Sequence, residues 1–184
     1  MPCAKRIRSM SNQTNVVHKK VGQIFRQLIT TDPSLTLLQD YACGGKQRLP
    51  LFCVPNKSRA NEFCNVDFLV LKDGKIKVIV EIEESNVKPT QVCGKLLTSA
   101  LAKYFIHECE ANKPVEMADS VLFIQIVDTS KLVRGKTAKY EQWKALEKSI
   151  NQILPVKDSS IKSYKLLTTN DLTELEAIIK KNLQ

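Results

Sequence analysis

One stretch, residues 65–84, constrains the fold of this chain more than any other. It reads NVDFLVLKDGKIKVIVEIEE, two runs rich in β-branched residues joined by an Asp-Gly dipeptide that is typical of tight hairpin turns. Because chain direction reverses at such a turn, the start of the first strand and the end of the second meet at one end of the hairpin. Asp67 lies at that start, and Glu81 and Glu83 lie at that end. The hairpin is therefore predicted to gather three acids in one place.

The pattern of the second strand sharpens this prediction. Successive side chains of a strand point to opposite faces, so Val78, Val80 and Ile82 would form one wholly apolar face that must meet a core. The opposite face ends in the two glutamates, and same-face carboxylates repel one another unless a cation lies among them. We therefore predict an oxygen-ligand site for Mg²⁺, with Mn²⁺ as a substitute. The alternative is a set of solvated acids at a strand end, but these acids are flanked by apolar residues.

Composition limits the class of protein. The 184 residues, 43% of them hydrophobic, suit one domain spanning residues 1–184, and no apolar run is long enough to cross a bilayer. Lysine and arginine total 28 against 19 acids, giving a net charge of +9. Such an excess favours a polyanionic partner, nucleic acid before membrane, although a merely basic protein is the open alternative.

The cysteines point to a reducing compartment. Six are present and none forms a CxxC pair, so a zinc ribbon or knuckle is not expected. Cys43, Cys53 and Cys64 could cluster, but their spacing matches no known ligand pattern. We interpret all six as reduced thiols of an intracellular, cytoplasmic protein.

Hydrophobic periodicity predicts an alternation of helices and strands. Helices are expected at residues 14–30, 90–110, 137–154 and 171–183, and strands at residues 35–41, 49–54, 66–71, 76–82, 121–127 and 161–167. The order is that of an α/β protein with a central mixed β-sheet flanked by helices.

This order, with Asp67 on one strand and Glu81-Ile82-Glu83 closing the next, resembles the PD-(D/E)XK nuclease superfamily. The resemblance covers residues 14–127 and implies a restriction-endonuclease-like core, αβββαβ, with a C-terminal αβα addition. In the resulting D-x13-E-x-E site, Asp67 matches the metal-binding aspartate and Glu81 the first acid of the (D/E)XK element. The backbone carbonyl of Ile82 would be a further metal ligand.

The chain departs from the family pattern at the lysine position, which Glu83 occupies. Either Lys88 or Lys95 can supply the missing ammonium from the following loop or helix, or Glu83 orients the water itself. Gln91 is similar to the helix glutamine of the recombination-type branch. Because the first helix carries no glutamate, Glu62 is the expected substitute for the additional acid that this helix often provides.

Basic residues at two places are expected to contact nucleic-acid phosphates. Lys57 and Arg59 lie in a polar loop close in sequence to the acids. Lys5, Arg6 and Arg8 lie in a basic stretch at residues 1–12, which we interpret as an arm rather than as a mitochondrial-type targeting segment. With no aromatic residues interleaved among these basic residues, base stacking is not indicated.

The resemblance implies a Mg²⁺-dependent endonuclease that hydrolyses phosphodiester bonds in DNA. The alternatives are a catalytically inactive nuclease-like module that binds nucleic acid, and an α/β scaffold whose charge is incidental. A chain of 184 residues leaves little room for a target-recognition domain, so a homodimer or a partner subunit is expected if cleavage is site-specific.

Overall fold

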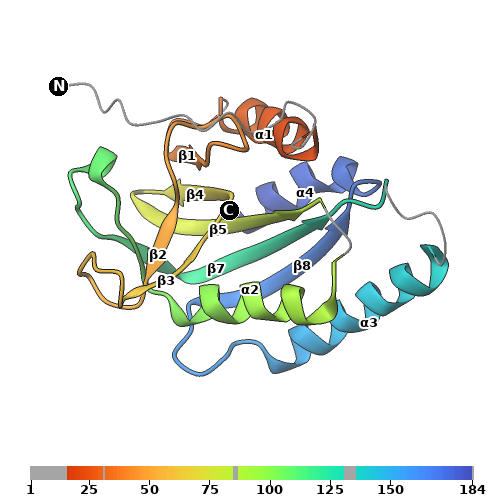
Figure 1. The fold of residues 1–184 in the computed structure, drawn as a ribbon. Coiled ribbons are helices and arrows are strands. Elements are labelled where there is room, and N and C mark those ends of the chain that lie inside the picture. The colour runs from red at the N-terminus through yellow and green to blue at the C-terminus, as the bar shows by residue number, and fades with distance from the viewer. Residues whose placement is uncertain (1–15, 31, 85–86, 131–135, 184) are drawn as a thin grey trace.

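The protein is an α/β structure built on a mixed sheet flanked by helices (Figure 1). The structure is a computed structural model and describes residues 16–30, 32–84, 87–130 and 136–183. The predictions for Lys5, Arg6 and Arg8 therefore lie outside the described residues. The elements are α1 (Val16–Ile29), β1 (Leu35–Gln39), β2 (Pro50–Phe52), β3 (Glu62–Asn65), β4 (Phe68–Lys72), β5 (Lys75–Glu83), α2 (Pro89–Leu101), β6 (Tyr104–Phe105), the 3₁₀ turn η1 (Glu108–Glu110), β7 (Val115–Val127), α3 (Lys136–Ile153), β8 (Ile161–Thr168) and α4 (Leu172–Leu183).

The sheet combines an antiparallel half with a parallel half. Strands β1, β4 and β5 form an antiparallel meander, and β5 then pairs in parallel with β7. On its other edge β7 pairs in parallel with β8, while its first residues pair antiparallel with β6, which continues through β2 to β3. Helix α2 makes the crossover that a parallel β5–β7 pair requires.

The predicted hairpin is confirmed as β4 and β5, with Lys72 opposite Lys75. Asp73 and Gly74 both have positive φ, 51° and 78°, which is the backbone of a two-residue I′ turn. This turn fixes the register, and the register pairs Phe68 with Val80. Asp67 therefore lies immediately before β4, beside the end of β5 that carries the glutamates.

Each face of the sheet packs against two helices. The apolar face of β5, which includes Val78, Val80 and Ile82 as predicted, packs under α1 and α4. The other face contains Ile79 and packs under α2 and α3. Because both faces of β5 are covered, the glutamates at its end lie in a buried environment rather than at an open strand end.

The predicted helix at residues 90–110 is wrong in its second half. Helix α2 ends at Leu101, and Ala102 is extended, with φ −78° and ψ 157°. Tyr104 and Phe105, which we expected on the helix, form β6 and pair with β2 and β7. Pairing with two strands outweighs the local helical pattern there. Similarly, β7 begins at Val115, six residues before the predicted start at residue 121, and β3 was not predicted as a strand.

Two further expectations concern the environment of the chain. Among the described residues no helix has both the length and the apolar character needed to span a bilayer. The five cysteines in the described part of the chain, Cys43, Cys53, Cys64, Cys93 and Cys109, are all free thiols.

Candidate metal and catalytic site

The centre of the candidate site is an ion-paired lysine between two buried glutamates. Lys95, from the second turn of α2, places its Nζ 2.8 Å from Glu81 Oε2 and 2.9 Å from Glu83 Oε1. Glu81 is 2% exposed and Glu83 9% exposed. The cation that the sequence required among these acids is, in this structure, the Lys95 ammonium. Of the two lysines left open by the sequence, Lys95 is the one in contact with both glutamates.

The acidity of the site differs from that of acids in water. Burial, and next the charge of Asp67, raise the pKa of Glu81 to about 8, against the opposing effect of Lys95. Burial also raises the pKa of Asp67. Burial would lower the pKa of Lys95, but the two glutamates outweigh it and the pKa is raised. Since the charge of Asp67 acts on Glu81, the two predicted metal ligands share one electrostatic environment.

Asp67 is held by backbone contacts on both sides. Its N–H donates to Val80 O at 3.2 Å, and its carbonyl accepts from Asp40 N–H at 3.0 Å. Its side-chain Oδ2 accepts from the Ile82 N–H at 2.6 Å. The carboxylate therefore continues the β4–β5 ladder by one further bond, with its other oxygen, Oδ1, directed elsewhere.

The direction of the Ile82 carbonyl follows from the same ladder. Carbonyl groups two residues apart on a strand point to the same side. Val80 O accepts from the Asp67 N–H and so points toward the Asp67 side of β5. Glu83 O accepts from the Asp128 N–H and so points toward β7. The Ile82 carbonyl therefore points toward the edge where the Asp67 side chain lies, as the predicted metal ligand requires.

On its other side Asp67 meets residues that the sequence did not single out. His18 of α1 places Nε2 3.7 Å from Asp67 Oδ1 and Nδ1 2.6 Å from Glu84 Oε1. Cys43, fully buried in the turns after β1, offers its Sγ to the same cluster. The first helix thus contributes a histidine where we had expected no helix residue and had proposed Glu62 instead.

A buried amide completes the face that carries the glutamates. Gln125 of β7 is opposite Glu81 in the parallel register and is 0% exposed. Its Oε1 accepts from the Tyr164 hydroxyl at 2.7 Å, while its Nε2 has no hydrogen-bond partner among the described residues. A donor of this kind beside a carboxyl cluster is available to an oxygen-rich ligand.

Two other predicted site residues, Gln91 and Glu62, make their hydrogen bonds elsewhere. Gln91 Oε1 accepts from the Lys88 backbone N–H at 2.8 Å, so it caps α2, and both side chains are exposed. Glu62 accepts from Asn65 Nδ2 and pairs with Arg48 at 3.3 Å. The structure thus gives Gln91 and Glu62 structural partners of their own.

The basic loop is placed away from the acids. Lys57 donates to Asn112 Oδ1 at 3.1 Å, and Arg59 is exposed in the same loop, between β2 and β3. In Figure 1 this loop lies at the far side of the sheet from the point where β5 ends and α2 begins. Strand β3 separates this loop from Asp67, and the β4–β5 hairpin follows before the glutamates.

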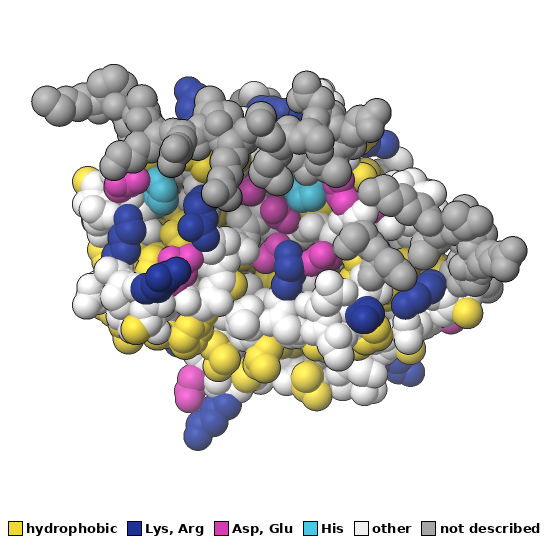
Figure 2. All heavy atoms as spheres, in the orientation of Figure 1, with side chains coloured by type: hydrophobic (Ala, Val, Ile, Leu, Met, Phe, Trp, Pro, Cys, Tyr) yellow, Lys and Arg dark blue, Asp and Glu magenta, His cyan; other side chains and the backbone are white. Residues whose placement is uncertain are grey.

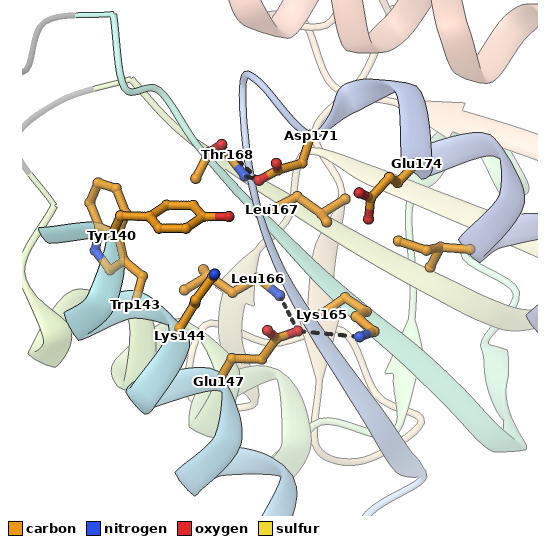
Figure 3. A pocket seen from close by; sticks show the side chains of 11 residues that line it. Tyr140, Trp143, Lys144, Glu147, Lys165, Leu166, Leu167, Thr168, Asp171 and Glu174 are labelled. Carbon is orange, nitrogen blue, oxygen red and sulfur yellow. Dashed lines mark hydrogen bonds and ion pairs between the residues drawn. The ribbon is translucent and has the colours of Figure 1, made fainter. Parts of the chain in front are cut away.

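Acidic side chains gather at two places that can be compared as candidate sites. Figure 2 shows acidic side chains, a basic side chain and a histidine close together in the middle of one face. Figure 3 shows a hollow between α3, β8 and the start of α4, which Tyr140 enters. There Glu147 accepts from Leu166 N–H and pairs with Lys165, and Asp171 accepts from Thr168. Because these acids serve local structure, we place the candidate site at Glu81.

Comparison of the chain with protein-family models, with curated proteins and with solved structures finds no match.

Proposed function

We propose that this protein is a Mg²⁺-dependent endonuclease that hydrolyses phosphodiester bonds in DNA. The observation that carries the proposal is the acid cluster at the end of β5, where Lys95 pairs with Glu81 and Glu83 and the charge of Asp67 acts on Glu81. Four carboxyl groups, including that of Glu84, lie beside one lysine and one histidine, so the site has more acidic than basic groups.

The order and direction of the strands support a restriction-endonuclease-like core. The αβββαβ arrangement expected from the resemblance corresponds to α1, the antiparallel meander β1–β4–β5, the crossover α2 and the parallel strand β7. In this arrangement the motif acids fall immediately before β4 and at the end of β5. The strands β2, β3 and β6 are additions to that core.

The donor set fits a hard divalent cation. Asp67, Glu81 and the carbonyl of Ile82 are oxygen ligands, which Mg²⁺ and Mn²⁺ prefer. A carboxyl group with a pKa of about 8 is mostly protonated at neutral pH, and a nearby dication would favour its ionised form. The residues present therefore suit Mg²⁺ chemically.

Each residue then has a role in hydrolysis. When bound, Mg²⁺ lowers the pKa of a coordinated water and neutralises charge that develops on the phosphoryl oxygens. Glu83 occupies the position where the motif usually has a lysine, and Lys95 supplies the ammonium group instead. This ammonium orients the nucleophile or stabilises the phosphoryl charge. Glu83, paired with Lys95 at 2.9 Å, fixes the direction of that side chain.

A second candidate is a nuclease-like module that binds nucleic acid without cleaving it. The observation that favours it is that Lys95 pairs with both Glu81 and Glu83. Among the described residues, Lys95 is the only lysine within ion-pair distance of Glu81. A lysine so engaged can be a structural replacement for the metal rather than a partner of it.

Plasmid nicking separates these functions. We expect wild-type protein to nick supercoiled DNA with Mg²⁺ and not with EDTA, and Glu81→Gln and Lys95→Met each to lose activity on the order of 100-fold or more. Glu176→Gln, an exposed acid paired with Lys180, is the matched control and should retain activity. Absence of nicking by wild type, together with salt-sensitive DNA binding, would support the binding module. Absence of both would leave only the scaffold.

A further inference from the structure

Three ligand atoms of different chemistry converge on the α1 side of Asp67. His18 comes from α1, Cys43 from the turns after β1, and Asp67 from the residue before β4. A ring nitrogen, the thiol sulfur and a carboxylate oxygen all lie within 4.8 Å of one another. His18 is 9% exposed and Cys43 0% exposed.

Hydrogen bonds to residues outside the cluster fix the orientation of the His18 ring and of the Asp67 carboxylate. Glu84 Oε1 lies 2.6 Å from His18 Nδ1 and also accepts from the His18 backbone N–H at 3.2 Å, which fixes the orientation of the ring. With Nδ1 turned to Glu84, Nε2 is the ring nitrogen that faces Asp67 Oδ1, at 3.7 Å. The Ile82 N–H holds Oδ2 of Asp67, which leaves Oδ1 facing the histidine. A carboxylate behind a histidine is the usual outer support of a metal-binding imidazole.

The close packing of α1 on the turn that carries Cys43 depends on Gly22. A Cβ at this position would lie 2.8 Å from the Cys43 carbonyl oxygen and 3.0 Å from Gln39 Nε2. The Cys43 N–H in turn donates to Asp40 Oδ1 at 3.0 Å. The helix that provides the histidine is thus held directly against the backbone that provides the thiol.

We propose that His18, Cys43 and Asp67 bind one thiophilic divalent cation, of which Zn²⁺ is the natural choice. Tetrahedral Zn²⁺ with bonds of about 2.1 Å to nitrogen and oxygen separates those two ligand atoms by about 3.4 Å. The 3.7 Å between Nε2 and Oδ1 is close to that value. Sulfur and nitrogen ligands disfavour Mg²⁺, so this position differs in metal preference from the oxygen-ligand position at Glu81.

The site has three protein ligands and so leaves a fourth position for water or an exogenous ligand, the pattern of catalytic zinc sites. Binding replaces the S–H bond of Cys43 by a sulfur–metal bond, and the proton passes to solvent. Asp67 would use Oδ1 here. The proposal stands on the geometry of the three ligands and does not depend on nuclease activity.

Metal-free protein provides the test. With one equivalent of Zn²⁺ added, wild type should retain one zinc per chain after gel filtration, measured by elemental analysis. Co²⁺ alone should give the intense near-ultraviolet absorption of a thiolate–cobalt bond. Cys43→Ala should abolish that absorption. Glu84→Gln, which removes an outer partner of His18, should weaken Zn²⁺ binding by about 10- to 100-fold, and His18→Gln should weaken it by more than that.

Two control variants show whether zinc binding is specific to the three proposed ligands. Cys64→Ala removes another partly buried thiol, hydrogen-bonded to Ser99, and should leave zinc retention and the cobalt spectrum unchanged. Glu81→Gln should likewise keep the zinc while losing Mg²⁺-dependent nicking, so failure of one proposal is distinguishable from failure of the other. Equal zinc retention by wild type, Cys43→Ala and His18→Gln would overturn the proposal, as would a wild-type cobalt complex without thiolate absorption.

Discussion

Replacing Glu81 by glutamine should stabilise the metal-free protein at alkaline pH, because the folded protein holds this carboxyl where its ionised form is unfavourable. The pKa of Glu81 is raised from 4.5 to about 8 in the folded protein. The folded chain therefore keeps a proton that the unfolded chain has released between these values, and stability must fall as pH rises through this window. Below about pH 4.5 both states are protonated, so the penalty is absent.

The size of the penalty follows from the same two values. Each pKa unit corresponds to about 1.4 kcal/mol, so the difference between 4.5 and about 8 amounts to about 5 kcal/mol once the pH exceeds 8. Glu81 is 2% exposed, so solvent screens little of this energy. Glutamine has nearly the same shape and no charge, and Lys95 keeps its pair with Glu83 at 2.9 Å. Glu81→Gln should thus gain stability over wild type progressively from about pH 5 to about pH 9.

Urea unfolding in EDTA at several pH values measures this effect as the difference in unfolding free energy between variant and wild type. Glu176→Gln is the control, because this acid is exposed and pairs with Lys180 one helical turn away, which is worth only about 0.5 kcal/mol. A difference between Glu81→Gln and wild type that does not change with pH would refute the reasoning. Excess Mg²⁺ should narrow the difference at alkaline pH by stabilising wild type alone.

Three further perturbations test the packing around the site, each by urea unfolding. Lys95→Met should lower stability at neutral pH by about 1–3 kcal/mol, because it leaves two buried carboxyl groups without their ammonium. Gly22→Ala should lower the free energy of unfolding by about 1–3 kcal/mol, because its Cβ would lie 2.8 Å from a backbone oxygen. Gly94→Ala, a helix position with open space around it, should raise the free energy of unfolding by about 0.5–1 kcal/mol. Equal effects of the two alanines would contradict this packing argument. Gln125→Leu should cost about 1–3 kcal/mol by stranding the Tyr164 hydroxyl, and adding Tyr164→Phe should recover most of that loss; additive losses would contradict the pairing.

The acid hairpin was predictable because its signals are local. A period-two pattern, an Asp-Gly turn and acids at fixed positions specify the register, and the structure has β4 and β5 as expected, with Asp67 beside the end of β5. The crossover by α2 and the buried strand β7 also follow from apolar patterns read in order. Lys95 was one of two lysines that the sequence left open, beside the possibility that Glu83 acts alone, and the packing of α2 on the sheet brings Lys95 to the glutamates.

The other side of the site depends on contacts that no short stretch of sequence encodes. His18 lies in line with Val21 and Phe25 on the buried stripe of α1, and a polar residue on such a stripe was the available signal. Gln125 was a similar signal, the one polar residue in the apolar run of residues 121–127. The sequence around Cys43 gave no such signal, because Cys43 approaches Asp67 only through the packing of α1 on the turns after β1.

The end of α2 shows the same limit. Neither glycine nor proline follows Leu101, so the sequence continues a helical pattern up to the residues that the sheet recruits as β6. Long-range strand pairing, which periodicity cannot report, decided the boundary.

The central claim is that Asp67 and Glu81 hold a divalent cation, and calorimetric titration of the metal-free protein with Mn²⁺ tests it most directly. The account predicts one binding event in wild type that is lost in both Asp67→Asn and Glu81→Gln and retained in Cys43→Ala. A wild-type protein that binds no Mn²⁺, or that binds it equally well after the change at Glu81, would contradict the account.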